Sequence, residues 1–157
     1  MAHLKAKALE LTGTCQFPPD IVGENQDWRS RNREVLNMVI RVAVVDDHPL
    51  FRDGVVATVN ASPGFEVVAQ GECGSDAVRI ARHVHPDIML LDVNMPENGI
   101  DAAREISAIS PSVKTVMLTG CEGVEAAARE AGARMSITKG VSGAELVTTL
   151  RTVYLGT

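Results

Sequence analysis

Five short apolar segments, each followed by a stretch of helical periodicity, constrain what this chain can fold into. The expected strands lie at 39–45, 65–69, 88–91, 113–118 and 135–137. The expected helices lie at 49–59, 75–84, 100–109, 122–131 and 142–154. Strands that alternate with helices in this way predict βαβ units, and therefore a parallel sheet with helices on both faces.

The connection rules for such sheets leave few topologies open. Crossovers between parallel strands are right-handed, and five strands with five helices favour the strand order 2-1-3-4-5. We therefore predict an α/β fold, a flavodoxin-like (βα)5 three-layer sandwich.

Two serines are expected to begin helices. Ser75 can act as the N-cap of the second helix. Ser142 and Glu145 have the spacing of a capping box at the start of the last helix.

The first 37 residues lack the periodicity of the remainder. They contain Pro18-Pro19 and a polar run from Glu24 to Glu34. We predict that residues 1–37 are an N-terminal extension, disordered or foreign to the fold, and that residues 38–157 form the folded domain. No output domain is expected in this chain.

Charge and cysteine content exclude several classes of function. Residues 1–37 carry five basic and five acidic side chains, so the whole net charge of -5 lies in the predicted domain. A nucleic-acid surface needs a basic face, which argues against one here. The three cysteines are far apart, and no apolar run is long enough for a membrane span, so we expect a cytoplasmic location.

Polar side chains occur at the carboxyl ends of four expected strands. They are Asp46 and Asp47, Asp92, Thr119 and Lys139. In a parallel sheet these ends share one rim, where functional residues gather. Three clustered carboxylates repel one another and favour a cation, and an all-oxygen set suits Mg²⁺. Metal and lysine together would neutralise charge during phosphoryl transfer to a carboxylate.

The pattern resembles the receiver domain of response regulators over roughly residues 39–155. The segments that carry the resemblance are Val44-Val45-Asp46-Asp47-His48-Pro49, Pro86 to Pro96 with Asp92-Val93-Asn94-Met95-Pro96, Leu118-Thr119, and Ala131-Gly132-Ala133 leading to Lys139. Asp46-Asp47-His48-Pro49 and Lys139-Gly140-Val141-Ser142-Gly143 look most like the NarL/FixJ subfamily, whose output domain is of the LuxR type.

The resemblance implies a Mg²⁺ site. Asp92 is its phosphoacceptor carboxylate, Asp47 is a direct ligand, and Asp46 helps through water. The backbone carbonyl of Asn94 completes the protein ligands. His48 is implied to be a loop residue rather than a base.

The resemblance also implies how a phosphoryl group on Asp92 is held. Thr119 would form a hydrogen bond with it, and Lys139 would pair with its charge. The domain would be a signalling switch that promotes its own phosphorylation and dephosphorylation, and not a turnover enzyme.

The partners implied are protein partners. A sensor histidine kinase supplies the phosphoryl group, and homodimer formation on phosphorylation stays open. DNA would be contacted only through a C-terminal helix-turn-helix domain outside this chain, and no membrane contact is expected.

The sequence departs from the family pattern at three places. Ser136 stands where the family usually has an aromatic residue, three positions before Lys139. The segment between Thr119 and Ala131 is about two residues short, and the turn after Pro96 about one. In the family this aromatic ring changes position as the domain is phosphorylated, so Ser136 brings that response into question.

Three other functions remain open. A phosphatase of the haloacid-dehalogenase type also phosphorylates an aspartate, but it needs a second acid where this chain has Asn94. An atypical receiver that binds without phosphorylation is compatible with Ser136. A nucleotide-binding flavodoxin-like protein would need a glycine-rich first turn, which the residues after Val45 do not supply.

Overall fold

A computed structural model of the chain describes residues 38–156. In chain order the elements are β1 (Ile40–Val45), α2 (Pro49–Asn60), β2 (Phe65–Gly71), α3 (Gly74–His83), β3 (Ile88–Asp92), α4 (Gly99–Ile109), β4 (Lys114–Thr119), α5 (Glu125–Glu130), β5 (Met135–Thr138) and α6 (Gly143–Leu155). The predicted extension at 1–37 lies outside the described residues and stays a prediction. None of the helices within 38–156 is long and apolar enough to cross a membrane.

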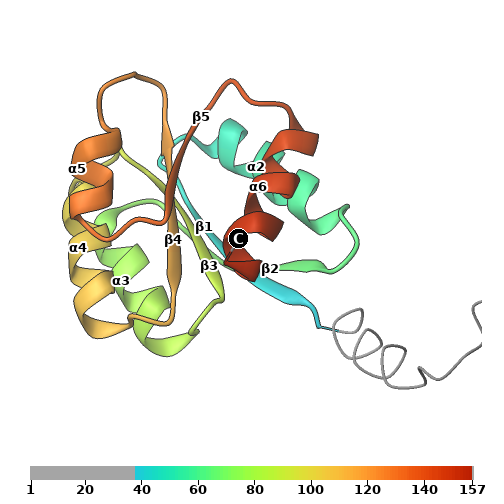
Figure 1. Cartoon of the computed structure of the whole chain (residues 1–157), viewed down its shortest axis with the longest axis horizontal. Helices are drawn as coiled ribbons and strands as arrows, with labels where there is room; N and C mark the ends of the chain where they lie inside the picture. The colour runs from blue at the N-terminus through green and yellow to red at the C-terminus, as the bar shows by residue number, and fades with distance from the viewer. Residues whose placement is uncertain (1–37, 157) are drawn as a thin grey trace, which may run out of the picture. The chain divides into compact units, whose positions relative to one another are not determined.

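The strands form one five-stranded sheet in the order β2-β1-β3-β4-β5, with every neighbouring pair parallel. Helices α3, α4 and α5 cover one face of the sheet, and α2 and α6 cover the other (Figure 1). The predicted fold class and strand order are therefore confirmed.

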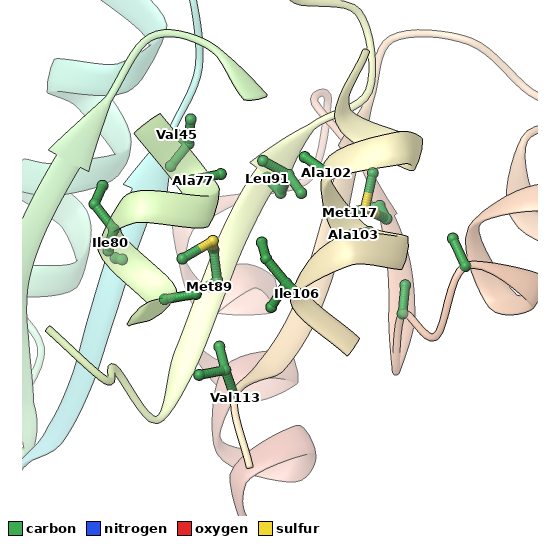
Figure 2. Packing of buried hydrophobic residues seen from close by; sticks show 14 of the residues in the cluster. Val45, Ala77, Ile80, Met89, Leu91, Ala102, Ala103, Ile106, Val113 and Met117 are labelled. Carbon is green, nitrogen blue, oxygen red and sulfur yellow. The ribbon is translucent and has the colours of Figure 1, made fainter. Parts of the chain in front are cut away.

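Alternating side chains of the central strands build two cores, one on each face of the sheet. Met89 and Leu91 of β3 pack toward α3 and α4, among the residues shown in Figure 2. Ile88 and Leu90 of the same strand pack toward α2 and α6. All five residues of β3 are buried, as expected for a central parallel strand, so Asp92 at its end is held on a rigid support.

Two predicted helix starts have different outcomes. The capping box at α6 is confirmed: Glu145 N–H donates to the Ser142 hydroxyl at 3.3 Å, and Ser142 N–H donates to the Glu145 carboxylate at 2.8 Å. The prediction that Ser75 caps α3 is wrong. Helix α3 begins at Gly74 with Cys73 as its N-cap, and the Ser75 N–H donates to the carboxylate of Glu97, a distant residue that no local pattern indicates.

Helix α5 is shorter than the sequence predicts. The expected helix covered 122–131, whereas α5 contains only Glu125–Glu130. Gly123 adopts φ +91°, a left-handed conformation that ends any helical path from Glu122. The residues between Thr119 and α5 therefore form a loop at the rim of the sheet.

Candidate functional site

The predicted polar residues do meet at one rim of the sheet. Asp46 directly follows β1, Asp92 ends β3, Thr119 ends β4, and Lys139 directly follows β5. Because β1, β3, β4 and β5 run parallel, these four positions lie at the same edge. The edge thus brings together side chains from residues far apart in the sequence.

An acidic cluster occupies this rim. Asp46 and Asp92 are fully buried, and the side chain of Asp47 is 31% exposed. One side-chain atom each from Asp46, Asp47, His48 and Asp92 lies within 4.8 Å of the others. Carboxylates this close in a buried setting repel one another, so the cluster favours bound positive charge.

Lys139 supplies part of that charge. Its ammonium nitrogen lies 2.7 Å from Oδ2 of Asp46 and 2.9 Å from Oδ2 of Asp92. Burial lowers the pKa of Lys139, but its contacts with these two carboxylates outweigh burial and raise the pKa above the ordinary 10.5. The lysine is therefore a fixed cation at the rim at neutral pH.

One lysine does not satisfy the carboxylate oxygens. Oδ2 of Asp46, Oδ1 of Asp47 and Oδ2 of Asp92 are all buried. Among the described residues, the ammonium of Lys139 pairs with the first and the last of these, at 2.7 and 2.9 Å. One positive charge thus faces three carboxylates. Buried acceptors of this kind usually bind a partner. The donor set is all oxygen apart from His48, so the cluster fits a metal ion.

His48 belongs to this cluster, although the sequence suggested only a loop role. Its backbone N–H donates to Oδ1 of Asp46 at 2.8 Å, and its Nδ1 lies 2.7 Å from Oδ1 of Asp47. Pro49 begins α2 immediately afterwards, which fixes the turn. In the sequence, the one sign that His48 joins the acidic cluster is its position between Asp46-Asp47 and Pro49.

The Thr119 hydroxyl is directed into its own loop. It donates to the carbonyl oxygen of Cys121 at 2.7 Å and accepts from the Cys121 N–H at 3.0 Å. Thr119 lies at the rim, as predicted, and it is buried there with its hydroxyl already bonded to Cys121. The hydroxyl would have to break its hydrogen bond with the Cys121 carbonyl in order to donate to a group bound at Asp92.

The loop after β3 supports Asp92 from the other side. Asn94 N–H donates to Oδ1 of Asp92 at 3.1 Å, which leaves Oδ2 for Lys139 and for a ligand. The sequence predicts the backbone carbonyl of Asn94 as a metal ligand, and this carbonyl lies on the same loop. The hydrogen bond from the backbone N–H of Asn94 to Asp92 is an additional contact that the sequence does not indicate.

Two residues of α2 position the cluster and were missed by sequence reasoning. Arg52 donates to the backbone carbonyl of Asp46 at 2.6 Å and pairs with Glu72 at 2.9 Å, with its side chain only 12% exposed. The ring centre of Phe51 lies 4.7 Å from Nζ of Lys139, a distance typical of a cation–π contact. In the sequence Phe51 is only a residue of an apolar helical stripe.

Ser136 lies on β5, opposite Met117 of β4, and is half-buried. The structure thus places a small side chain at the position where the family usually has an aromatic ring.

Comparisons with known proteins agree with this geometry. Residues 42–151 match the family model described as the response regulator receiver domain. Response regulator GacA from Pseudomonas aeruginosa is 39% identical over 121 residues, which are 75% of this chain and 56% of that relative. The chain therefore spans little more than half the length of GacA.

Solved structures give the same result. A LuxR-family two-component response regulator from Aurantimonas sp. SI85-9A1 is 34% identical, with TM-score 0.70 over 74% of this chain and 85% of that one. The signal receiver domain of the putative response regulator NarL from Mycobacterium tuberculosis is 28% identical, with TM-score 0.74 over 76% of this chain and 99% of that one.

Proposed function

The chain belongs to the response regulator receiver domain family of two-component systems, and on that premise we propose that it is switched by transfer of a phosphoryl group to Asp92. The family and the NarL/FixJ subfamily suggested by the sequence are both confirmed. One observation carries the proposal: the carboxylate of Asp92 is buried beside two more carboxylates, with Oδ2 2.9 Å from the ammonium of Lys139.

Mg²⁺ is the cation that we propose for the acidic cluster. Asp47 and Asp92 would be direct ligands together with the Asn94 carbonyl, and Asp46 would act through water. These hard oxygen donors suit Mg²⁺, which keeps several water ligands and takes few carboxylates. Bound there, the ion would neutralise charge on the incoming phosphoryl group.

The residues of the chain then have separate tasks. A side-chain oxygen of Asp92 attacks phosphorus, and the bond from phosphorus to the donor breaks with its electron pair leaving on the donor. Lys139, held protonated beside Asp92, pairs with a phosphoryl oxygen. Thr119 turns from Cys121 and donates its hydroxyl to another oxygen. The buried setting strengthens each of these charge interactions.

The site supports a switch better than a turnover enzyme. A phosphatase that forms an aspartyl intermediate needs a second acid two residues after the nucleophile, and this chain has Asn94 there. We therefore propose that hydrolysis of the phosphoryl group resets the domain rather than serving a substrate.

The family implies a sensor kinase as the phosphoryl donor. From the family we further propose that this kinase is a histidine kinase and that the chain is located in the cytoplasm. We also propose that phosphorylation promotes formation of a homodimer. The net charge of -5 argues against DNA binding by this chain, so we propose that any DNA contact is made by a helix-turn-helix domain outside it.

The proposal is tested by incubating the chain with a small phosphodonor and Mg²⁺ and measuring its intact mass. We expect one added phosphoryl group on the wild-type chain and none on Asp92→Asn. Asp101→Asn is the matched control, because Asp101 is an exposed acid on α4 that pairs with Arg104. Unchanged labelling of Asp92→Asn, or labelling that persists with a chelator, would overturn the proposal.

A further inference from the structure

The loop that follows Asp92 is bound to the beginning of helix α3. Ser75 N–H donates to Oε2 of Glu97 at 2.7 Å, and Gly74 N–H donates to the carbonyl oxygen of Pro96 at 3.1 Å. The first amides of a helix have no partner within it, and the Cys73 side chain caps none of the described ones. The carbonyl of Pro96 and the carboxylate of Glu97 therefore accept the hydrogen bonds that an N-cap side chain would normally accept at the start of α3.

The contact between loop and helix is close-packed on both sides. A β-carbon at Gly74 would collide with the carbonyl oxygen of Glu97, and a β-carbon at Gly99 would collide with the carbonyl oxygen of Asp92. Gly99 N–H also donates to the Val93 carbonyl at 3.2 Å. The start of α3, the loop and the backbone of Asp92 thus form one stack with no room for a β-carbon at either glycine.

The loop adopts a conformation that its residues do not favour. Glu97 has φ +63° and Asn98 has φ +29°, in the left-handed region that side chains other than glycine rarely adopt. Such a turn persists when surrounding contacts specify it. Asn98 accepts from Ile100 N–H at 3.0 Å and so caps α4, which leaves Glu97 as the side chain that bonds to α3.

The charge of Glu97 is favoured where it lies. Hydrogen bonds with the side chain and the backbone N–H of Ser75 hold the pKa of Glu97 below its ordinary 4.5. The group is therefore a carboxylate at neutral pH, placed at the positive end of a helix dipole.

We propose that Glu97 is a positioning residue for the phosphorylation of Asp92. By binding Ser75 N–H it fixes the loop 93–98, and with it the Asn94 carbonyl and amide, relative to the Asp92 carboxylate. This inference rests on the proposed function, because it assigns Glu97 a role in the same Mg²⁺ and phosphoryl site. The hydrogen bond of the Glu97 side chain is to Ser75, so Glu97 would act on the proposed metal ligands through the loop.

The first test measures Mg²⁺ affinity by calorimetric titration. We expect Glu97→Ala to weaken Mg²⁺ binding on the order of tenfold, as residues that orient metal ligands do. Glu97→Gln keeps an acceptor for Ser75 N–H and should recover most of the affinity. Glu105→Ala is the matched control, since Glu105 is an acid of α4 whose ion pair with Arg82 of α3, at 3.3 Å, does not involve Ser75.

The second test follows labelling from a small phosphodonor at low and saturating Mg²⁺. Glu97→Ala should be slow at low Mg²⁺ and approach the wild-type rate at saturation. In metal-free buffer its Gly74 and Ser75 amides should exchange hydrogen faster than those of Glu105→Ala. A lower melting temperature alone, with unchanged Mg²⁺ affinity, would overturn the proposal, as would equal loss of affinity in Glu105→Ala.

Failure of this inference and failure of the proposed function give different results. If Asp92 is not the phosphoacceptor, the wild-type chain stays unlabelled, or Asp92→Asn takes up label as the wild type does. If only the role of Glu97 is wrong, the wild-type chain is labelled and Glu97→Ala binds Mg²⁺ and takes up label as the wild type does.

Discussion

The ring of Phe51 lies against the ammonium group of Lys139, with 4.7 Å between Nζ and the ring centre. The same ammonium meets the carboxylates of Asp46 and Asp92 on another side. Lys139 is thus held by an aromatic ring from α2, by the acid that directly follows β1 and by the acid that ends β3. This arrangement makes the lysine a competitor for any cation at the acidic cluster.

Removing Lys139 should therefore strengthen Mg²⁺ binding. Two unit charges a few ångströms apart interact by a few kcal/mol at an effective dielectric constant of ~20, and screening removes part of this. We predict that Lys139→Ala raises Mg²⁺ affinity on the order of tenfold in a calorimetric titration. Lys114→Ala is the control, because Lys114 begins β4 at the opposite end of the strand from Thr119. Unchanged or weaker affinity in Lys139→Ala would contradict the competition.

The Thr119 hydroxyl should contribute to stability before any phosphorylation. Thr119→Ala removes two hydrogen bonds with Cys121, and a typical net contribution is about 1 kcal/mol for each. We predict a loss of about 1–2 kcal/mol in urea unfolding, with most of it recovered in Thr119→Ser. If Thr119→Ser is as unstable as Thr119→Ala, the methyl group rather than the hydroxyl is what matters.

The capping box of α6 predicts a dependence of stability on pH. The backbone N–H and the hydroxyl of Ser142 hold the pKa of Glu145 below its ordinary 4.5 in the folded state. A lowered folded pKa stabilises the fold above the unfolded pKa, and this stabilisation is lost as pH falls through the folded value. Glu145→Gln should thus be less stable than the wild type near pH 7, and the difference should shrink below about pH 4.

Urea unfolding at several pH values checks this prediction. Glu66→Gln, which changes an exposed carboxylate on β2, provides the control. Ser142→Ala should cost about 1 kcal/mol near neutral pH, the usual value for a lost N-cap. A Glu145→Gln effect that is constant from neutral to acidic pH would show that the carboxylate charge plays no part.

Much of the site follows from the sequence because strand ends are a strong constraint. Once five parallel strands are recognised, Asp46, Asp92, Thr119 and Lys139 must meet at one edge. The order of strands follows similarly from the crossover rules. Local patterns were also sufficient for the capping box at Ser142, whose partner is only three residues away.

What the sequence did not predict depends on contacts between distant segments. The cap of α3 comes from Glu97, which lies 22 residues after Ser75, so a local pattern pointed to the wrong residue. Arg52 reaches the carbonyl of Asp46 through a helix orientation that no motif describes. The Thr119 side chain can direct its hydroxyl either into its own loop or toward a ligand, depending on its rotamer. The sequence does not indicate which rotamer is adopted, and the structure shows the one bonded to Cys121.

The small side chain of Ser136 leads us to predict which segments change their hydrogen exchange when the domain is phosphorylated. A small, half-buried side chain on β5 can neither fill nor block the space that an aromatic ring would use. Phosphorylation adds roughly -1.5 to -2 charge at the rim, and a ligand shifts an equilibrium only by its differential affinity for two states. We therefore predict modest hydrogen-exchange changes on β5 and larger ones between Gly120 and Ala131.

Hydrogen exchange with and without a phosphoryl mimic and Mg²⁺ checks this route. Ser136→Tyr should enlarge the response on β5, since it restores a group whose packing can differ between states. Large changes centred on Ser136 in the wild-type chain, with little change between Gly120 and Ala131, would refute it.

We propose that Asp92, and neither of its neighbouring carboxylates, accepts the phosphoryl group. Borohydride reduces an aspartyl phosphate to homoserine, so trapping followed by peptide sequencing in a mass spectrometer locates the modified residue. We predict that, after treatment with a small phosphodonor and Mg²⁺, homoserine is found at position 92 and at neither 46 nor 47. Homoserine at position 46 or 47, or at no position in a chain that binds Mg²⁺, would contradict the account.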